Sequence, residues 1–540
     1  MAKLLKYWRK NMAGPDLPLQ SLPILYLKRG GKLNLKYFLK NNFQSRRQGD
    51  FRMKLKELLN NITYTLIQGD DNTEIVSIAW DSRNVENQSL FICVKGKTVD
   101  RHDYARLAIQ AGAVALVVEH DIDNISPDVT IIKVQDTKLA MACIARTYYN
   151  NPTAKCNLIG VIGSSGKSSV AWLLGILLSS CGRKTGIIDN LNSSENNEKI
   201  VFIKSHPNVP DSIKLNNDIN ELLNSGVTEI ITEISPSALL EYKYYGCKFK
   251  LCIILNSNED PDNNLFRQGN SIKQFSDLIQ ATESFVTSTL NMLSINLSRQ
   301  SQALDFVTYG IKLNKDQDVS ADNIIYKKEG TVFDLCFPDG TYKMISYQIP
   351  GKSFLENLLA SIAGCYKLGI SRKKIAAAIA DINCIKGRFE TVKNPRGHLI
   401  IIDSAYSPCA LKNLLLTVKD IIPGKIITVF GCGGDRDKKR RRELGIAAGE
   451  HADYCLITTD NPRTEEPITI INDIEEGLKE TGCAYEKVED RRMAIFKALA
   501  RLTDDDALVI SGKGQETYQV FMNHIKHFND RETVEEYFNK

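Results

Sequence analysis

The sequence of 540 residues has no hydrophobic run long enough to cross a membrane, which takes about 18 consecutive apolar residues or more. Near its start it lacks the apolar core and small-residue cleavage site of a secretory signal. The sequence therefore predicts a cytoplasmic protein. Charged residues make up 25% of the chain and hydrophobic residues 43%, a balance that is typical of globular proteins and not of disordered ones.

Patterns of metal-binding or disulfide-forming cysteines are also missing. The 13 cysteines include no Cys-x-x-Cys and no cluster with histidine at zinc spacing. An odd, dispersed set of cysteines in a long chain is typical of reduced thiols in a cytosolic protein. Most of them, for example Cys181 and Cys365, are predicted to be small buried apolar side chains.

Excess positive charge is confined to one end of the chain. Residues 1–52 hold 12 of the 69 basic residues but only 2 of the 64 acidic ones. The remaining 57 basic and 62 acidic residues leave the rest of the chain negative, so the body gives no reason to expect nucleic acid as a partner.

The basic arm, residues 1–52, has three interpretations. The first is a disordered extension or an over-long start, with the folded body beginning at Met53. The second is a peripheral membrane anchor, because its basic residues are interleaved with Leu, Tyr and Trp. The third is a transit peptide, which the small number of serines disfavours.

The chain after the arm divides into three α/β stretches, in line with a prior of about 150 residues per domain. Residues 53–155 alternate short β-rich runs with one or two helices. Residues 156–385 and 386–540 alternate buried strands and helices, which predicts parallel sheets with helices on both faces. The strands expected in the last stretch span residues 399–402, 426–430, 454–458 and 507–510. Ligands of such sheets bind beyond the carboxyl ends of the strands.

A glycine-rich loop lies between a predicted strand, residues 158–162, and a predicted helix, residues 168–180. Such glycines turn the backbone so that its N–H groups point inward, and the helix N-terminus adds partial positive charge. Lys167 can reach the β- and γ-phosphates of a nucleotide, and the Ser168 hydroxyl can join a Mg²⁺ shell. The Gly-x-x-Gly-Lys-Ser spacing predicts a compact phosphate-binding loop formed by Gly163, Gly166, Lys167, Ser168 and Ser169.

Three motifs of the last stretch carry a resemblance to a known family. Gly431-Cys-Gly-Gly-Asp-Arg-Asp437 is followed by Asp460-Asn-Pro-Arg463 and then by Ser511-Gly-Lys-Gly-Gln-Glu516. In this order they resemble the carboxyl-terminal domain of Mur ligases of the MurE type. The similarity extends over residues 54–540, including Asp81-Ser82-Arg83 and the Gly387-Arg-Phe-Glu390 segment that opens the third domain.

The resemblance implies a three-domain Mur ligase fold, with a central P-loop ATPase domain and a Rossmann-like carboxyl-terminal domain. It also implies an enzyme, an ATP-dependent and Mg²⁺-dependent ligase of peptidoglycan precursor synthesis. Such a ligase adds meso-diaminopimelate to UDP-N-acetylmuramoyl-L-Ala-D-Glu through an acyl phosphate. Both substrates are small molecules, and a monomer is expected.

Site roles follow from the resemblance where single positions match. Ser82, Arg83 and Pro210 correspond to residues that hold the UDP-linked substrate. Glu233 corresponds to the family's metal-ligand Glu at a strand end, and it is expected to share the metal with Ser168. The remaining nucleotide contacts carried over are Asn357, Arg388 and Asp403, and Lys167, Glu233 and Arg388 are the expected catalytic residues.

The acceptor clamp is the part of the resemblance that matches best. The family holds meso-diaminopimelate with residues that correspond here to Arg436, Asp460, Asn461, Pro462, Arg463, Gly512 and Glu516. An arginine fork can bind the distal carboxylate bidentately, and lysine has no such carboxylate. Glu516 is expected to pair with the distal ammonium.

Departures from the family pattern gather at the catalytic centre. The family's Thr-Thr-Pro motif is replaced here by Asn208-Val209-Pro210, and the position of the family's metal-binding His is occupied by Pro261. A carbamylated lysine is expected near Leu278 or Ile279, and Lys273 is the nearest lysine but out of register. The family's Asp-Tyr-Ala-His motif is replaced here by Asp403-Ser404-Ala405-Tyr406.

The departures leave two hypotheses from different classes. The first is a working ligase of the MurE type, with Glu259, Asp260 and Asp262 as substitute oxygen ligands for a cation. The second is a ligase-fold protein that binds nucleotide or diaminopimelate without turnover, as a scaffold or regulator. A ligase for a different acceptor is a variant of the first. The alternative for the acidic loop is a solvated surface segment.

Overall fold

The computed structural model describes residues 52–96, 99–163, 165–189, 200–204, 211–255, 270–288, 305–311, 317–382, 387–522 and 524–539. Met53–Lys540 forms one compact unit, of which Met1–Arg52 is not a part. Within the described ranges, no helix is both long and apolar enough to cross a membrane. The twelve cysteines in these ranges form no disulfide with one another, and Cys365 is fully buried as predicted, whereas Cys181 is half-buried.

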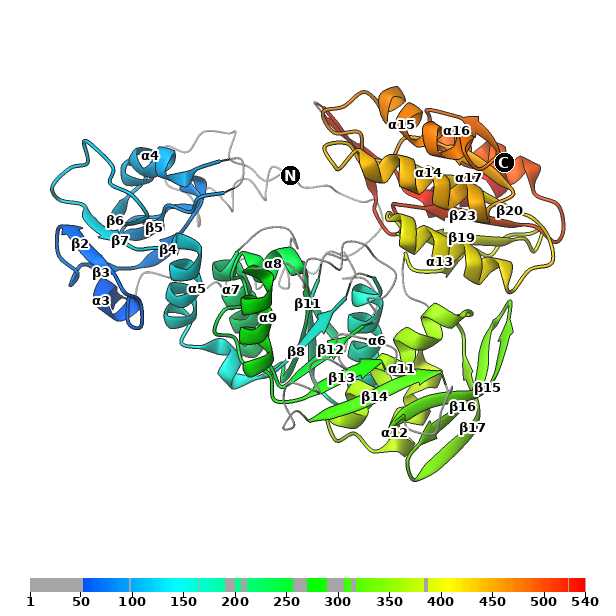
Figure 1. Ribbon diagram of the computed structural model, residues 1–540, viewed down its shortest axis with the longest axis horizontal. Coiled ribbons are helices and arrows are strands. Elements are labelled where there is room, and N and C mark those ends of the chain that lie inside the picture. Colours follow the sequence, from blue (N-terminus) through cyan, green and yellow to red (C-terminus); the bar gives the residue numbers. More distant parts are fainter. Residues whose placement is uncertain are drawn as a thin grey trace, which may run out of the picture. The chain divides into compact units, whose positions relative to one another are not determined.

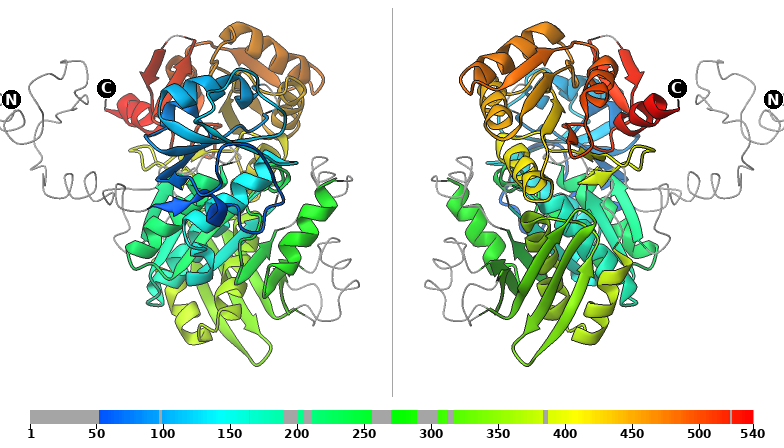
Figure 2. Two further views of the ribbon diagram at one scale, coloured as in Figure 1. Left: turned by 90° about the vertical axis from the view of Figure 1, so that its left-hand side faces the viewer. Right: turned by 90° about the vertical axis from the view of Figure 1, so that its right-hand side faces the viewer.

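The first α/β stretch contains a five-stranded sheet in the order β2-β7-β6-β5-β4. Its core lies on both faces, with α5 (Thr137–Tyr148) against one face and α4 (Ala105–Gln110) against the other (Figure 2). A short strand, β1 (Met53–Lys54), pairs separately with β3 (Glu74–Ile75) and leads into α3 (Leu55–Leu58). The strands of the main sheet are β2 (Thr65–Gln68), β4 (Ser77–Ala79), β5 (Ser89–Ile92), β6 (Ala113–Val118) and β7 (Thr130–Lys133).

The middle stretch is built on a ten-stranded sheet in the order β10-β9-β11-β8-β12-β13-β14-β15-β16-β17. One face packs on α6 (Lys167–Ser180), α11 (Lys352–Lys367) and α12 (Arg372–Ala378). The other packs on α7 (Ser212–Asn224), α8 (Pro236–Leu240) and α9 (Asn270–Gln280), as Figure 1 shows. The strands as far as β14 are β8 (Asn157–Ile162), β9 (Thr185–Asp189), β10 (Ile200–Lys204), β11 (Glu229–Ile234), β12 (Leu251–Ile254), β13 (Phe285–Ser288) and β14 (Phe306–Ile311).

The middle sheet is mixed and not purely parallel. The strands from β10 to β15 are parallel, as the alternation of strands and helices predicts. We did not predict from the sequence the antiparallel extension made by β15 (Val319–Lys327), β16 (Gly330–Phe337) and β17 (Gly340–Tyr347). Pro338 and Asp339 form a two-residue loop between β16 and β17, with Gly340 directly after it, so a local turn signal for this hairpin is present.

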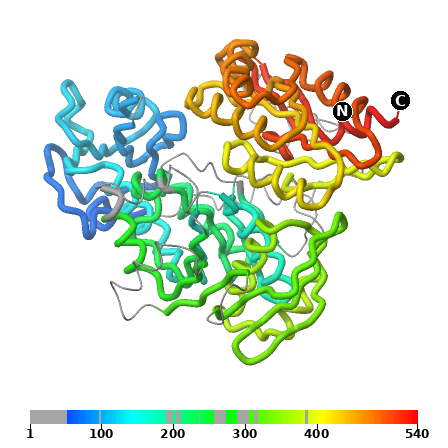
Figure 3. The backbone as a smooth tube through the Cα atoms, turned by 45° about the vertical axis from the view of Figure 1, so that its right-hand side comes forward, coloured from blue at the N-terminus to red at the C-terminus, as the bar shows by residue number. Residues whose placement is uncertain are grey.

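The carboxyl-terminal stretch has a six-stranded sheet in the order β18-β19-β23-β20-β21-β22. Side chains alternate between two cores, one under α13 (Pro408–Lys419), α14 (Lys439–His451) and α15 (Pro467–Lys479), and one under α16 (Arg491–Arg501) and α17 (Asp530–Phe538). Its central strands β19, β20 and β23 are nearly continuous runs of buried aliphatic residues, as expected when helices cover both faces (Figure 3). They are β18 (Glu390–Thr391), β19 (Leu399–Asp403), β20 (Ile426–Phe430), β21 (Tyr454–Ile457), β22 (Ala484–Lys487) and β23 (Ala507–Ser511), and a hairpin, β24 (Tyr518–Phe521) with β25 (His524–His527), follows.

Candidate functional site

The predicted phosphate loop follows β8, a central strand of the middle sheet, and leads into α6. Lys167 is the first residue of this helix, and its Nζ donates to the Gly163 carbonyl at 2.7 Å, so the side chain folds back over the loop. The first turn of α6 contains no acidic residue, which leaves the partial positive charge of the helix N-terminus unopposed there. Ser168 is half-buried in this turn and Ser169 is buried. This geometry suits the binding of a polyphosphate.

Gly166 fixes the shape of the loop. Its φ angle of 80° is in the left-handed region, and a β-carbon placed there would lie 2.6 Å from Oδ1 of Asn357. Asn357 belongs to α11, so its amide lies directly over the loop, where the sequence analysis expected a nucleotide contact. A side chain at position 166 would be strained by the backbone and obstructed by Asn357, so glycine is required at this position.

Glu233 lies near the end of β11, the strand beside β8, in register with Val161. The carboxylate is half-buried, and its Oε1 is shielded from solvent with no hydrogen-bond partner among the described residues. The strand end is held by Tyr244, whose hydroxyl donates to the Glu233 carbonyl at 2.5 Å. A buried carboxylate oxygen without a partner is costly, so this atom fits a cation ligand.

The structure describes only some of the residues at which ligands of a second cation were expected. Leu278 is buried in an apolar cluster with Phe275, on α9, and Lys273 is exposed on the same helix. The described part of α9 therefore offers no lysine at the position where the family places one. Pro210, Pro261 and the acidic residues Glu259, Asp260 and Asp262 lie outside the described residues.

Arg388 and Asp403 lie together at the start of the carboxyl-terminal stretch. Asp403 ends β19 and is buried, and its two oxygens accept the backbone N–H groups of Phe389 and Ala405, both at 2.7 Å. Burial raises the pKa of Asp403, against the opposing effects of the Arg388 charge and these two hydrogen bonds. Asp403 thus fixes the backbone that carries Arg388, whose Nε is buried without a partner in the described chain.

The acceptor clamp is assembled at the carboxyl ends of β21 and β23. Asp460 and Asn461 are buried after β21, and Arg463 has a left-handed φ of 54°. The Arg463 Nη1 donates to the Gly434 carbonyl at 2.5 Å. Gly512, directly after β23, has a φ of 104°, and a β-carbon there would lie 2.8 Å from Oδ2 of Asp460. The structure therefore places Asp460, the first residue of the predicted motif, beside Gly512.

Glu516 completes this cluster through a residue that the sequence analysis did not single out. Its Oε2 accepts from Nδ2 of Asn461 at 2.9 Å and from Nζ of Lys513 at 2.9 Å. Lys513 is almost completely buried. The only sequence signal for it was its place inside the Gly512–Glu516 motif, three residues before Glu516.

Two buried arginines, Arg491 and Arg441, hold chain segments that adjoin the acceptor clamp. Arg491 forms a two-pronged ion pair with Asp530 and donates to the Ser511 carbonyl at 2.9 Å, just before Gly512. Arg441 pairs with Glu465 and Asp473, and its hydrogen bonds lower the pKa of Glu465 to about 2. These pairs hold the segments on either side of the clamp in place.

Arg436 is exposed in the loop after β20. The structure joins its neighbour Asp435 to the segment after the clamp, because the Asp435 N–H donates to Glu465 at 2.6 Å and Thr464 donates to Asp435. A contact between the Arg436 side chain and the clamp is not found among the described residues. The loop is therefore close in the fold, whereas the role expected for Arg436 itself remains a prediction.

The residues expected to hold the uridine end lie in a short turn after β4. Asp81 caps this turn, and hydrogen bonds from the Arg83 side chain lower the pKa of Asp81 to about 2. The Arg83 side chain is 83% exposed, and Ser82 is half-buried. Arg101 lies 5.4 Å from the ring centres of both Trp80 and Tyr104, which builds an aromatic and cationic surface beside the turn.

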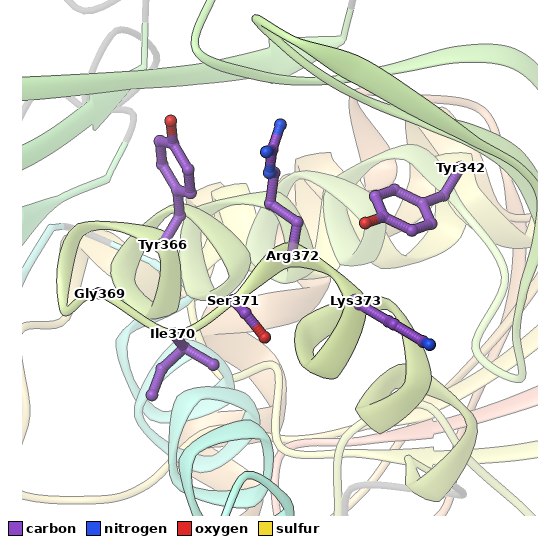
Figure 4. Close-up of a pocket in the computed structure, with 7 residues that line it drawn as sticks. All are labelled: Tyr342, Tyr366, Gly369, Ile370, Ser371, Arg372 and Lys373. Atoms are coloured by element: carbon purple, nitrogen blue, oxygen red, sulfur yellow. The ribbon is translucent and has the colours of Figure 1, made fainter.

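Two other features lie apart from these clusters. Ligand atoms of Asp100, His102 and His120 lie within 4.8 Å of one another, but His102 uses both ring nitrogens, one toward Asp100 and one toward the Glu119 N–H. A cavity of about 390 Å³ adjoins the carboxyl end of α11, away from Asn357 near its start (Figure 4). Its residues are Tyr342, Tyr366, Gly369, Ile370, Ser371, Arg372 and Lys373, and Arg372 is paired with Asp339.

Comparison with protein-family models gives three matches along the chain. Residues 74–149 match the Mur ligase family catalytic domain, residues 161–365 the Mur ligase middle domain, and residues 387–514 the Mur ligase glutamate ligase domain. The three matches follow one another in the order of the three stretches described above. The chain therefore belongs to the Mur ligase family.

The curated relatives that match the chain include 2,6-diaminopimelate ligases. The chain is 35% identical to UDP-N-acetylmuramoyl-L-alanyl-D-glutamate--2,6-diaminopimelate ligase 2 of Clostridium acetobutylicum, over 90% of this chain and 99% of the relative. It is 36% identical to UDP-N-acetylmuramoyl-L-alanyl-D-glutamate--2,6-diaminopimelate ligase of Clostridioides difficile, over 90% of this chain and all of that relative.

Solved structures agree on the fold. A structure of UDP-N-acetylmuramoyl-L-alanyl-D-glutamate--2,6-diaminopimelate ligase matches with a TM-score of 0.60 at 22% identity, over 91% of this chain and 99% of that one. MurF ligase from Thermotoga maritima, solved in complex with ADP, matches with a TM-score of 0.54 at 18% identity. The match covers 86% of this chain and 96% of that one.

Proposed function

We propose that this chain is an ATP-dependent ligase of the MurE type, which adds meso-diaminopimelate to UDP-N-acetylmuramoyl-L-Ala-D-Glu. The observation that carries the proposal is the acceptor clamp, where Asn461, Arg463 and Glu516 lie together in a chain whose relatives are named diaminopimelate ligases. No observation in the described part of the chain favours the non-catalytic alternative.

In the proposed reaction, a substrate carboxylate attacks the γ-phosphorus of ATP and ADP leaves. The acceptor amine then attacks the acyl carbon, phosphate departs with the acyl oxygen, and the amine loses a proton. Lys167 and the N-terminus of α6 bind the polyphosphate and stabilise the charge that develops on it. When bound, Mg²⁺ would neutralise charge between the two anions, and Ser168 with Oε1 of Glu233 would hold it.

Selection of the acceptor is assigned to the clamp. Arg463 keeps one nitrogen on the Gly434 carbonyl, which orients the rest of its guanidinium for a carboxylate. Glu516 supplies negative charge for an ammonium. A ligand with both groups at its distal end satisfies both residues, whereas lysine leaves the arginine without a carboxylate.

The test is phosphate release by the purified protein with ATP, Mg²⁺ and the UDP-linked dipeptide, with meso-diaminopimelate or lysine as acceptor in parallel. We expect release only with the complete mixture and with diaminopimelate. Lys167→Ala should reduce the rate by about 10²-fold or more, because a positioned cation at a phosphoryl-transfer site is removed. The control is Lys155→Ala, since Lys155 is exposed and outside the loop. Turnover that does not depend on diaminopimelate would contradict the proposal.

Removal of divalent cations tests the assignment of Glu233. Phosphate release should stop in excess chelator and return with added Mg²⁺. Glu233→Gln should raise the Mg²⁺ concentration needed for half-maximal rate, because an amide is a weaker ligand than a carboxylate for a hard cation. An unchanged Mg²⁺ requirement in Glu233→Gln would exclude Glu233 as a ligand.

A further inference from the structure

Lys513 is a buried lysine whose place in the fold calls for an explanation. It lies in the turn after β23 and has about 1% of its surface exposed. A buried ammonium is unfavourable unless it is paired and hydrogen-bonded. Its Nζ lies 2.9 Å from Oε2 of Glu516, 3.5 Å from Oδ1 of Asn461 and 5.8 Å from the centre of the Tyr518 ring. Its polar partners are thus two residues of the acceptor clamp.

The contacts of Asn461 and Glu516 leave one carboxylate oxygen available. Oδ1 of Asn461 accepts the Val520 N–H at 2.9 Å, which turns its Nδ2 toward Glu516. Asn461 and Lys513 both use Oε2 of Glu516, and Oε1 has no hydrogen bond within the described chain. The Glu516 side chain is 37% exposed, so Oε1 is within reach of a ligand.

We propose that Lys513 is a positioning residue for the acceptor amino acid, and that it holds Oε2 of Glu516 so that Oε1 is presented to the distal ammonium. The inference rests on the proposed function and adds a residue to it. A glutamate on a half-exposed turn otherwise samples several rotamers, and fixing it before binding removes that entropic cost from ligand binding. Lys513 itself is too deeply buried to contact the ligand, so it acts through Glu516.

The test compares two acceptors that differ only in the distal ammonium, meso-diaminopimelate and 2-aminopimelate. For the wild type we expect a lower KM for meso-diaminopimelate by about tenfold or more, the usual effect of a charge-assisted hydrogen bond. Lys513→Met keeps most of the buried side-chain volume and removes the charge. In this variant the KM for meso-diaminopimelate should rise about tenfold, the KM for 2-aminopimelate should stay nearly unchanged, and kcat should fall less than about threefold.

Two variants make the test specific. Lys513→Arg should retain most of the preference for meso-diaminopimelate, because a cation remains beside Glu516. Glu516→Gln should lose the preference, and the double variant with Lys513→Met should lose no more than the single one, since both act on one contact. The matched control is Lys526→Met, an exposed lysine on β25. The Kd for ATP, measured by calorimetry on each variant, confirms a folded protein.

The outcomes separate this inference from the proposed function. Equal rises in KM for both acceptors in Lys513→Met, with ATP binding intact, would overturn the positioning role and leave the ligase in place. A wild type that neither turns over nor binds meso-diaminopimelate would overturn both. If Lys513→Met does not bind ATP, Lys513→Arg decides the question, because a preference lost there overturns the role.

Discussion

Arg491 and Asp530 form an ion pair in which neither side chain is exposed. Two hydrogen bonds of 2.8 and 2.9 Å join them, and Arg491 also donates to the Ser511 carbonyl. Nearby Asp460 and Glu516 add to the negative field that raises the pKa of Arg491 against the opposing effect of its burial. At the scale of single residues, this pair holds the turn that carries Gly512 and Lys513 through the Ser511 carbonyl.

Asp530→Asn should therefore destabilise the carboxyl-terminal stretch by about 3–5 kcal/mol, because it leaves a buried guanidinium without its counter-charge. Hydrogen exchange measured by mass spectrometry on peptides from β23 and α16 reports the loss directly. Lys250→Met, which breaks an exposed pair with Glu283, should cost about 1 kcal/mol or less. Equal effects of the two substitutions would contradict the importance given to burial.

At the scale of elements, α7 buries three polar residues, Ser212, Asn216 and Asp218. Burial raises the pKa of Asp218 from an ordinary value of 3.8 to about 6, although Lys214 Nζ lies 2.7 Å from its Oδ1. Because the folded protein binds this proton more tightly than the unfolded chain, the contribution of Asp218 to stability falls as pH rises from about 4 to about 6.

Asp218→Asn should remove that dependence. Relative to the wild type, the variant should gain about 2 kcal/mol between pH 4 and pH 7, since each pKa unit corresponds to about 1.4 kcal/mol. The measurement is the free energy of unfolding of both proteins across this range. Asp504→Asn, at an exposed position, serves as control. A constant difference between wild type and variant would show that Asp218 does not titrate there.

The elements that could be predicted are those with a local signal. The strand expected over residues 426–430 is β20, and the helix expected over 168–180 is α6 with one more residue at its start. Strands β15 and β17 were missed because their half-exposed sequences lack the buried runs of the parallel strands, although a turn signal lies between β16 and β17. Lys513 was missed for another reason, since burial of a lysine depends on partners such as Asn461 that are distant in sequence.

At the scale of the whole molecule, the positive charge of residues 1–52 contrasts with the negative remainder, which forms a compact unit of its own. A chain that begins at Met53 should keep ligase activity within about twofold, because the P-loop and the clamp lie in that unit. If the arm is a peripheral membrane anchor, the full chain should bind vesicles with anionic lipids and release them as salt increases, whereas the shortened chain should not. Sedimentation with vesicles measures this, and equal binding of both chains would contradict the interpretation of the arm as an anchor.

Through the Arg491–Asp530 pair, helix α17 near the end of the sequence also supports the acceptor site. Asp530 is the first residue of α17, only ten positions before Lys540. A nonsense codon or frameshift just before it would leave every P-loop and clamp residue in the gene product. Acceptor recognition should nevertheless be lost, so an allele with such a late truncation should behave as a null and not as a mild variant.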